Sequence, residues 1–208
     1  MTEKESLKIS LSILQIDALK EVGSIGTAHA ATALSDLTGT KVNIKVPHVE
    51  LCRITQIPEL SDFHGKEITG IRTLLKGGMN GEISMIMEST KALNLAALLL
   101  KKEPGTIKML GTMEISALKE AVNIMIGSYL MAVTRLSGIL SMPSVPELFQ
   151  EDFDSHINAL IEKNNTHNRY AIIIHTIVIL HKTNIDGNLI LIPEAESLER
   201  ILDSIGVK

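Results

Sequence analysis

The longest repeating pattern of apolar and polar residues covers positions 112–138 and has the period of an α-helix. Apolar side chains recur there every three or four residues, as expected for a helix with one face against a core. The opposite stripe is polar or small apart from Met131. The apolar positions are Leu118, Val122, Met125, Tyr129, Ala132 and Leu136, and the stripe holds Ser116, Glu120, Asn123, Gly127, Met131 and Thr134. We predict one long helix with a buried side and a side that is free to meet a partner.

A second segment, 12–38, has the same pattern and predicts another long helix, with Gly39 as a left-handed stop. Two glycines in mid-helix cost about 1 kcal/mol each relative to alanine. We expect them to allow another backbone to come close; the alternative is that they weaken or kink the helix. The outer stripe is Asp17, Glu21, Ser24, Ala28, Thr32 and Ser35, and the inner face is Leu19, Gly23, Gly26, Ala30, Ala33 and Leu37.

The rest of the chain predicts strands and shorter helices. In the first half, strands are expected at 41–54 with an interruption at Pro47, at 67–76 and at 82–88, the last two forming a hairpin. A loop at 58–65 and a helix at 90–101, capped by Ser89 or Thr90, complete that half. In the second half we expect a short or irregular strand at 142–146, an added helix at 146–161, a turn at 164–168, a hairpin of 170–181 and 189–192 around 184–187, and a last helix at 194–205 ending at Gly206.

The two halves are copies of each other. A shift of 99 residues lays Asp17-Ala-Leu-Lys-Glu21 over Ser116-Ala-Leu-Lys-Glu120, and a shift of 106 lays Asn80-Gly81 over Asp186-Gly187. This is a tandem duplication of roughly 100 residues. We therefore predict a single domain over 1–208, made of repeats at about 12–104 and 111–208. The fold class is α+β with a pseudo-twofold internal repeat: a mixed or antiparallel central sheet, two long helices carrying the sites, and further covering helices.

Glu120 and Asn123 lie three residues apart, so their side chains are neighbours on the helix surface. The carboxylate accepts hydrogen bonds or pairs with a cation, and the carboxamide offers one acceptor and two donors. Together they could hold a partner and position a water molecule. Taken alone, the pair is better explained as two ordinary solvated helix residues, and only its context favours a site.

The duplicated motif resembles that of the CheC/CheX/FliY family of chemotaxis phosphatases. The motif is [D/S]-x-x-x-E-x-x-N on a long helix, and the resemblance extends from about Leu14 to Ile205. The second copy matches it in full with Ser116, Glu120 and Asn123. The first keeps Asp17 and Glu21 but has Ser24 in place of Asn, and Ala28 stands where the second copy has Gly127. A serine hydroxyl is shorter than a carboxamide and offers one donor instead of two. We expect one working site, at Glu120 and Asn123, and a degenerate one at Glu21 and Ser24.

The resemblance implies a hydrolase of two-component signalling. Its partner would be a phosphorylated CheY-type receiver, which carries its own Mg²⁺, so the chain itself needs no cofactor. Asn123 would orient a water for attack on the aspartyl phosphate, and Glu120 would contact a lysine of the receiver. CheD, a receptor glutamine deamidase, is a second partner implied by the family. The alternative is a docking module of the chemotaxis or flagellar switch apparatus that binds the phosphorylated receiver without turnover.

Composition narrows the remaining possibilities. With three Phe, two Tyr and no Trp, the core must be aliphatic and Met-rich. The net charge of −4 and the lack of Lys or Arg runs argue against nucleic acid as a partner. The longest apolar stretches, 92–100 and 170–180, are shorter than the about 20 residues that span a bilayer, so we expect no membrane insertion. The N-terminus lacks a signal-peptide pattern and the single cysteine, Cys52, excludes an internal disulfide, which favours a cytoplasmic protein.

The seven histidines suggest no metal site at the level of sequence. None lies in an HExxH or HxH arrangement. His175 and His181 are six residues apart on a predicted strand, with no acidic or cysteine ligand nearby in the sequence, and His29 is expected on a helix surface. We therefore expect no bound metal.

Overall fold

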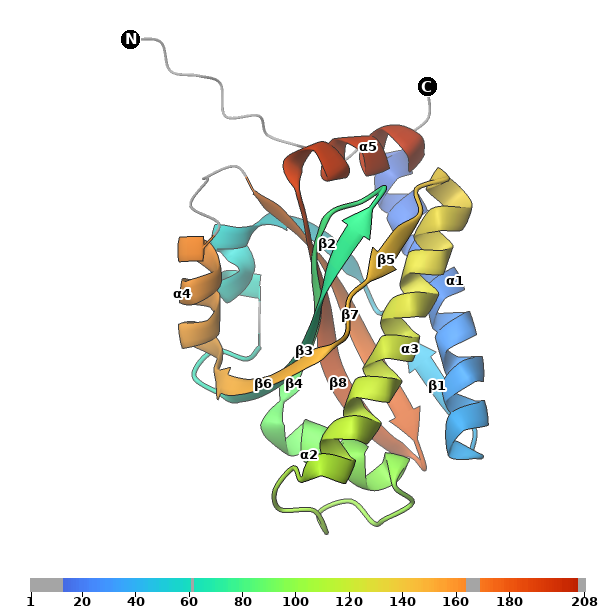
Figure 1. The fold of residues 1–208 in the computed structure, drawn as a ribbon, viewed down its shortest axis with the longest axis vertical. Coiled ribbons are helices and arrows are strands. Elements are labelled where there is room, and N and C mark those ends of the chain that lie inside the picture. Colours follow the sequence, from blue (N-terminus) through green and yellow to red (C-terminus); the bar gives the residue numbers. More distant parts are fainter. Residues whose placement is uncertain (1–12, 61, 164–168, 206–208) are drawn as a thin grey trace.

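The computed structural model describes residues 13–60, 62–163 and 169–205. Two long helices, α1 (Ile13–Thr38) and α3 (Thr112–Ser137), lie side by side and antiparallel along one face of a sheet (Figure 1). Each ends at a glycine in the left-handed conformation, Gly39 with φ +66° and Gly138 with φ +72°. Both predicted long helices are therefore confirmed.

The strands form one eight-stranded antiparallel sheet, as the predicted α+β class requires. The order is β1-β7-β8-β4-β3-β5, with β2 also pairing with β7 and β6 with β3. The strands are β1 (Val42–Lys45), β2 (Val49–Arg53), β3 (Glu67–Gly77), β4 (Gly81–Glu88), β5 (Ser141–Pro143), β6 (Glu147–Asp152), β7 (Tyr170–Leu180) and β8 (Thr183–Pro193).

The strand register carries the internal symmetry predicted from the sequence. The shift of 106 residues makes Ser84 of β4 the counterpart of Ile190 of β8, and these two residues lie directly opposite each other. The pseudo-twofold axis therefore passes between them. On either side of this axis, the edge strands are exchanged: β1 and β2 of the first half pair with β7, while β5 and β6 of the second half pair with β3.

Both faces of the sheet are covered. One core lies between the sheet and α1, α3, α2 (Ser89–Leu99) and α5 (Ala195–Ile205), and a smaller one lies under the 3-10 helix η1 (Ile54–Leu60) and α4 (Phe153–Lys163). Alternate residues of a strand enter the two cores, so Ile172 and Ile173 point to opposite faces. In Figure 1, α4 lies on the side of the sheet away from α1 and α3, with α5 at one end of the molecule and α2 at the other.

Gly26 lies where α1 and α3 cross. A Cβ atom there would be 2.6 Å from Cδ1 of Tyr129 and 3.1 Å from its Cα, so the second helix occupies the space that a side chain would need. The expected close backbone approach is thus confirmed at Gly26. At Gly23 the corresponding Cβ would make ordinary contact with Val46 at 3.5 Å.

The added helix predicted at 146–161 is wrong over its first part. Residues Glu147–Asp152 form strand β6 on the edge of β3, and the helix α4 begins only at Phe153. Phe149 lies over Gly70, where a Cβ would be 2.0 Å from its ring. The glycine makes room for the aromatic ring between paired strands, a long-range fit that the local helical pattern did not reveal.

The predicted turn of the second hairpin is also wrong. The chain reverses at His181 and Lys182, whose φ values are +49° and +65°, and residues 184–187 lie within β8. Gly187 instead lies against β4, because a Cβ there would be 2.6 Å from Cε of Met85 and 2.9 Å from the carbonyl oxygen of Ile86. The Asp186-Gly187 pair therefore reflects close packing of strands and not a turn.

Smaller expectations need adjustment. Leu37 and Leu136, placed on the buried helix faces, are 49% and 39% exposed. The N-cap of α2 is Glu88, without a side-chain cap, and η1 occupies the start of the predicted loop at 58–65.

The predicted turn at 164–168 and the stop at Gly206 lie outside the described residues. Among the helices of the described ranges, none combines the length and apolar character that crossing a bilayer demands.

Candidate functional site

Helix α3 is held firmly at its start and along its inner face. The backbone N–H of Gly111 donates to Oε2 of Glu114 at 3.2 Å, and Lys102 pairs with the same carboxylate at 3.3 Å. Hydrogen bonds from the backbone N–H of Glu114 itself and from Lys102 keep the pKa of Glu114 below its usual range. Nine residues of the helix are buried: Leu118, Ala121, Val122, Met125, Ile126, Ser128, Tyr129, Leu130 and Ala132. The helix is thus a rigid support for whatever its outer face presents.

The outer face of α3 presents Glu120 and Asn123. Glu120 is exposed and Asn123 is half-buried. Within residues 13–60, 62–163 and 169–205, neither side chain has a hydrogen bond or an ion pair with another residue. Their polar groups are therefore free to bind a partner.

Gly127 continues this face one turn further along the helix. A Cβ atom at this position would meet nothing within 4 Å, so packing within the chain does not require a glycine. Beyond it, Met131 is 61% exposed. Ser116, at the other end of the motif, turns its hydroxyl back to the carbonyl of Thr112 at 2.8 Å. The face consequently offers a polar pair that is followed along the helix by a glycine and an exposed methionine.

The first copy of the motif lies on the outer face of α1. Asp17, Glu21 and Ser24 are all exposed, and Asp17 makes a long surface contact of 3.8 Å with Lys20. Ala28, the counterpart of Gly127, is also exposed. Because the two helices run antiparallel (Figure 1), the two motifs are separate faces and do not form one composite site. The motif on α1 therefore has the carboxylate of the pair, from Glu21, but not the amide.

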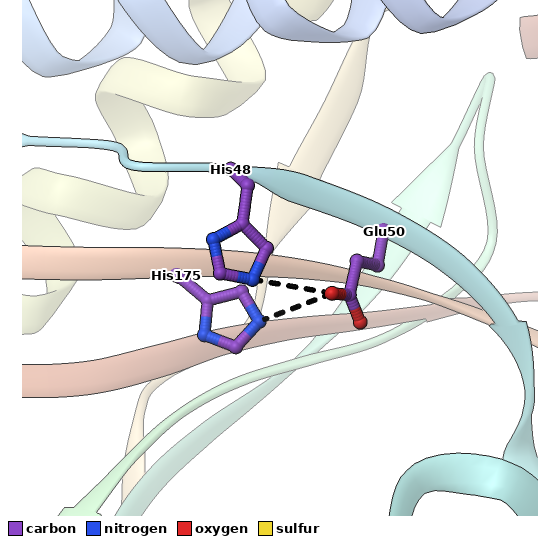
Figure 2. A group of neighbouring side chains, drawn as sticks. All are labelled: His48, Glu50 and His175. Atoms are coloured by element: carbon purple, nitrogen blue, oxygen red, sulfur yellow. Dashed lines mark ion pairs between the residues drawn. The ribbon is translucent and has the colours of Figure 1, made fainter. Parts of the chain in front are cut away.

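The structure also brings together a group that sequence reasoning missed. Glu50 of β2 and His48, which directly precedes this strand, lie next to His175 of β7 (Figure 2). The donor atoms of the three side chains lie within 4.8 Å of one another. The expectation that no metal would be bound considered only neighbours along the chain, and the acidic neighbour of His175 comes from a different strand. The His48-x-Glu50 spacing on a predicted strand was the available signal, since i and i+2 side chains share a face.

Comparison with known proteins places the chain among chemotaxis proteins. A model of the CheC-like family matches residues 14–51, which include the first motif. The protein called CheY-P phosphatase CheC of Bacillus subtilis is 30% identical over 199 residues, covering 92% of this chain and 94% of that protein. The flagellar motor switch phosphatase FliY of the same organism is 34% identical over 134 residues, 63% of this chain and 33% of its own length.

A solved structure shows the same fold. The crystal structure of Thermotoga maritima FliY superimposes with a TM-score of 0.77 at 20% identity, covering 95% of this chain and 98% of that one. The resemblance seen in the duplicated motif therefore extends over nearly the whole length of a relative and over the whole architecture. The chain belongs to the CheC-like family.

Proposed function

We propose that this chain is a phosphatase that promotes hydrolysis of the aspartyl phosphate of a CheY-type receiver. Its relatives are named as phosphatases, one of them as acting on CheY-P, and the match to that relative covers nearly all of both chains. The observation that carries the proposal is the outward display of Glu120 and Asn123, without partners among the described residues, on a helix whose other side is buried.

The proposed chemistry is one of placement. Asn123 enters the phosphate pocket of the receiver and orients a water molecule in line with the phosphorus atom, a recognised role in phosphoryl transfer. Holding reactants in attack geometry lowers a barrier by several kcal/mol, with about 7–11 kcal/mol as the upper range. The Mg²⁺ belongs to the receiver, and the chain supplies neither a nucleophile nor a metal for this step.

Glu120 fixes the docking. One turn of helix separates its carboxylate from the amide of Asn123, so contact with a receiver lysine orients the amide at the same time. Gly127 lets the receiver approach the helix backbone, since no side chain projects there. Ser24 lacks the reach and the second donor of an amide, so the first copy contributes little turnover.

The test is single-turnover decay of a phosphorylated CheY-type receiver with and without the full chain. Asn123→Ala and Asn123→Asp should both lose the acceleration, because the first removes the amide and the second replaces it with an anion of the same shape. The matched control is Ser24→Ala, which also truncates a polar side chain to alanine, at the equivalent position of α1. This variant should keep most activity. Decay at the wild-type rate with Asn123→Ala would overturn the assignment.

The second candidate function is docking without turnover, favoured by the one observation that Ser24 leaves the first motif without its amide. In that case the chain would bind the phosphorylated receiver and leave its decay rate unchanged. A binding measurement on the same variants separates the two functions. Glu120→Ala weakens binding in both, and only a phosphatase loses turnover with Asn123→Ala while still binding.

Three further expectations belong to this proposal. The chain acts as a single domain over 1–208, in the cytoplasm with its receiver. CheD is a second partner, proposed from the family resemblance alone. Co-purification of CheD with the full chain, compared with the Glu120→Ala variant, checks that the two partners use different surfaces.

A further inference from the structure

Strand pairing between the two halves brings His48, Glu50 and His175 together on the sheet face opposite the long helices. Val49 and Leu51 of β2 pack toward the core under α1 and α3, whereas Cys52 enters the core on the other face. Glu50 shares the parity of Cys52, and so does His48, because alternate residues of a strand point the same way. The backbone N–H of His175 donates to the carbonyl of His48 at 3.1 Å, which fixes the two strands side by side.

The donor atoms converge on one carboxylate oxygen. Oε1 of Glu50 lies 3.1 Å from Nε2 of His48 and 4.0 Å from Nε2 of His175. Figure 2 shows both imidazoles turned toward this oxygen. A tetrahedral ion with bonds of 2.0–2.1 Å separates its ligand atoms by about 3.3 Å. The two imidazoles are stacked, with ring centroids 3.7 Å apart and 29° between their planes, so metal binding requires the exposed His48 ring to turn out of this stack until all three donors reach that spacing.

Two of the polar atoms in this group are buried without a hydrogen-bond partner in the part of the chain that the structure describes. They are Nε2 of His175 and Oε2 of Glu50. Leaving such atoms unsatisfied is costly, and few native groups do so without a reason. Asn188, its pairing neighbour across β7 and β8, lines the same cavity as His175. A polar side chain in this position can orient a metal-ligating histidine through its other ring nitrogen.

We propose that His48, Glu50 and His175 bind a divalent transition-metal ion of the zinc class. Two imidazoles and a carboxylate suit Zn²⁺ or its neighbours in the first row, whereas Mg²⁺ and Ca²⁺ prefer oxygen ligands throughout. The ligands come from both halves of the chain, so the ion ties the edge strand β2 to β7. This site is separate from the Glu120 and Asn123 face and does not depend on the proposed phosphatase function.

A fourth ligand position opens into a cavity of about 370 Å³ that His48 and His175 help to line. Two carboxylates in its wall are already paired with lysines, Glu88 with Lys66 at 3.4 Å and Asp186 with Lys91 at 3.1 Å. The exposed Asp62 also lines the cavity, so the fourth position is open to its carboxylate, to water or to a small ligand.

Titration of the full chain with Zn²⁺ by calorimetry tests the site, with Mg²⁺ as the comparison ion. Wild type should bind one equivalent of Zn²⁺, gain thermal stability with it, and show no saturable Mg²⁺ binding outside the noise. Co²⁺ should give the intense visible absorption of a tetrahedral site. His48→Ala and Glu50→Gln should each weaken Zn²⁺ binding at least about tenfold, since even outer-shell changes cost 10–100-fold.

The matched control is His64→Ala, which removes an exposed histidine that also pairs with a carboxylate, Asp154, but lies outside the group. Its Zn²⁺ affinity should equal that of the wild type. His48 is exposed, so its variant should fold normally even if His175→Ala does not. Absence of saturable Zn²⁺ binding, or equal binding by the His48→Ala and His64→Ala variants, would overturn the site.

Discussion

The ring of Tyr129 lies against the backbone of Gly26, so no side chain of residue 26 separates α1 from α3 at this point. Tyr129 is 2% exposed, and a Cβ on Gly26 would come within 2.6 Å of the ring and 3.1 Å of the Tyr129 backbone. The contact sets how far apart the two motif-bearing helices lie. Each motif is thus supported by the packing of the other helix.

Gly26→Ala should destabilise the protein, because its methyl group overlaps Tyr129. Overpacking of a tight core costs about 1–3 kcal/mol, and the better helix propensity of alanine returns up to about 1 kcal/mol. Gly23→Ala is the matched control on the same helix. Its Cβ makes only ordinary contact with Val46 at 3.5 Å, so it should be neutral or stabilising. Urea unfolding of the two variants measures the difference, and equal stabilities would contradict the crossing described here.

Tyr129 should make stability depend on alkaline pH. Burial raises the pKa of its phenol from 10.0 to about 12. Between these values the unfolded chain loses the proton while the folded chain keeps it, so stability falls as the pH rises, by up to about 1.4 kcal/mol per pH unit. Comparing denaturant unfolding of wild type and Tyr129→Phe from pH 9 to pH 12 isolates this effect. The variant should show a shallower loss, and parallel curves would refute the prediction.

Restoring the amide to the first motif should give it activity. We expect the triple variant Ser24→Asn, Ala28→Gly, Asn123→Ala to recover part of the receiver dephosphorylation that Asn123→Ala alone loses. The first motif already has an exposed Glu21, and these changes complete it. The control is Ala28→Gly with Asn123→Ala, which lacks the amide and should stay inactive. Single-turnover decay is the measurement, and no recovery would show that the first face lacks more than Ser24 and Ala28.

Gly127→Leu should impair docking while leaving the fold intact. No atom lies within 4 Å of a Cβ at this position, and leucine is a better helix former than glycine by up to about 1 kcal/mol. The variant should therefore unfold at an equal or higher denaturant concentration and yet accelerate receiver decay at least about tenfold less. Ala28→Leu, at the equivalent exposed position of α1, is the control and should remain active. Full activity of Gly127→Leu would show that the receiver does not approach this face.

The elements whose apolar pattern is long and regular were predicted well from the sequence. Both long helices, the glycine stop at Gly39 and the β3 to β4 hairpin are confirmed, because each depends on residues close together in the chain. The 99-residue and 106-residue shifts further predicted an internal symmetry that the β4 to β8 register carries. The positions of Glu120 and Asn123 on an exposed face follow from helical period alone.

The errors fall where distant strands decide the conformation. Residues 147–152 read as part of a helix because the six-residue strand is followed at once by α4, and only its pairing with β3 makes it extended. Asp186-Gly187 read as a turn, although the glycine is needed for contact with Met85. The His48, Glu50 and His175 group was missed for the same reason, since its members meet only through the β2 to β7 ladder.

The exchange of edge strands between the halves has a consequence for how the two motifs can evolve. The edge strands of each repeat complete the sheet of the other repeat, so the fold needs both repeats even if the surface of one has no function. The fold therefore requires α1 whether or not Glu21 and Ser24 act on a receiver. If the site on α1 is degenerate, as we propose, its exposed face can take on a different binding role without loss of the fold.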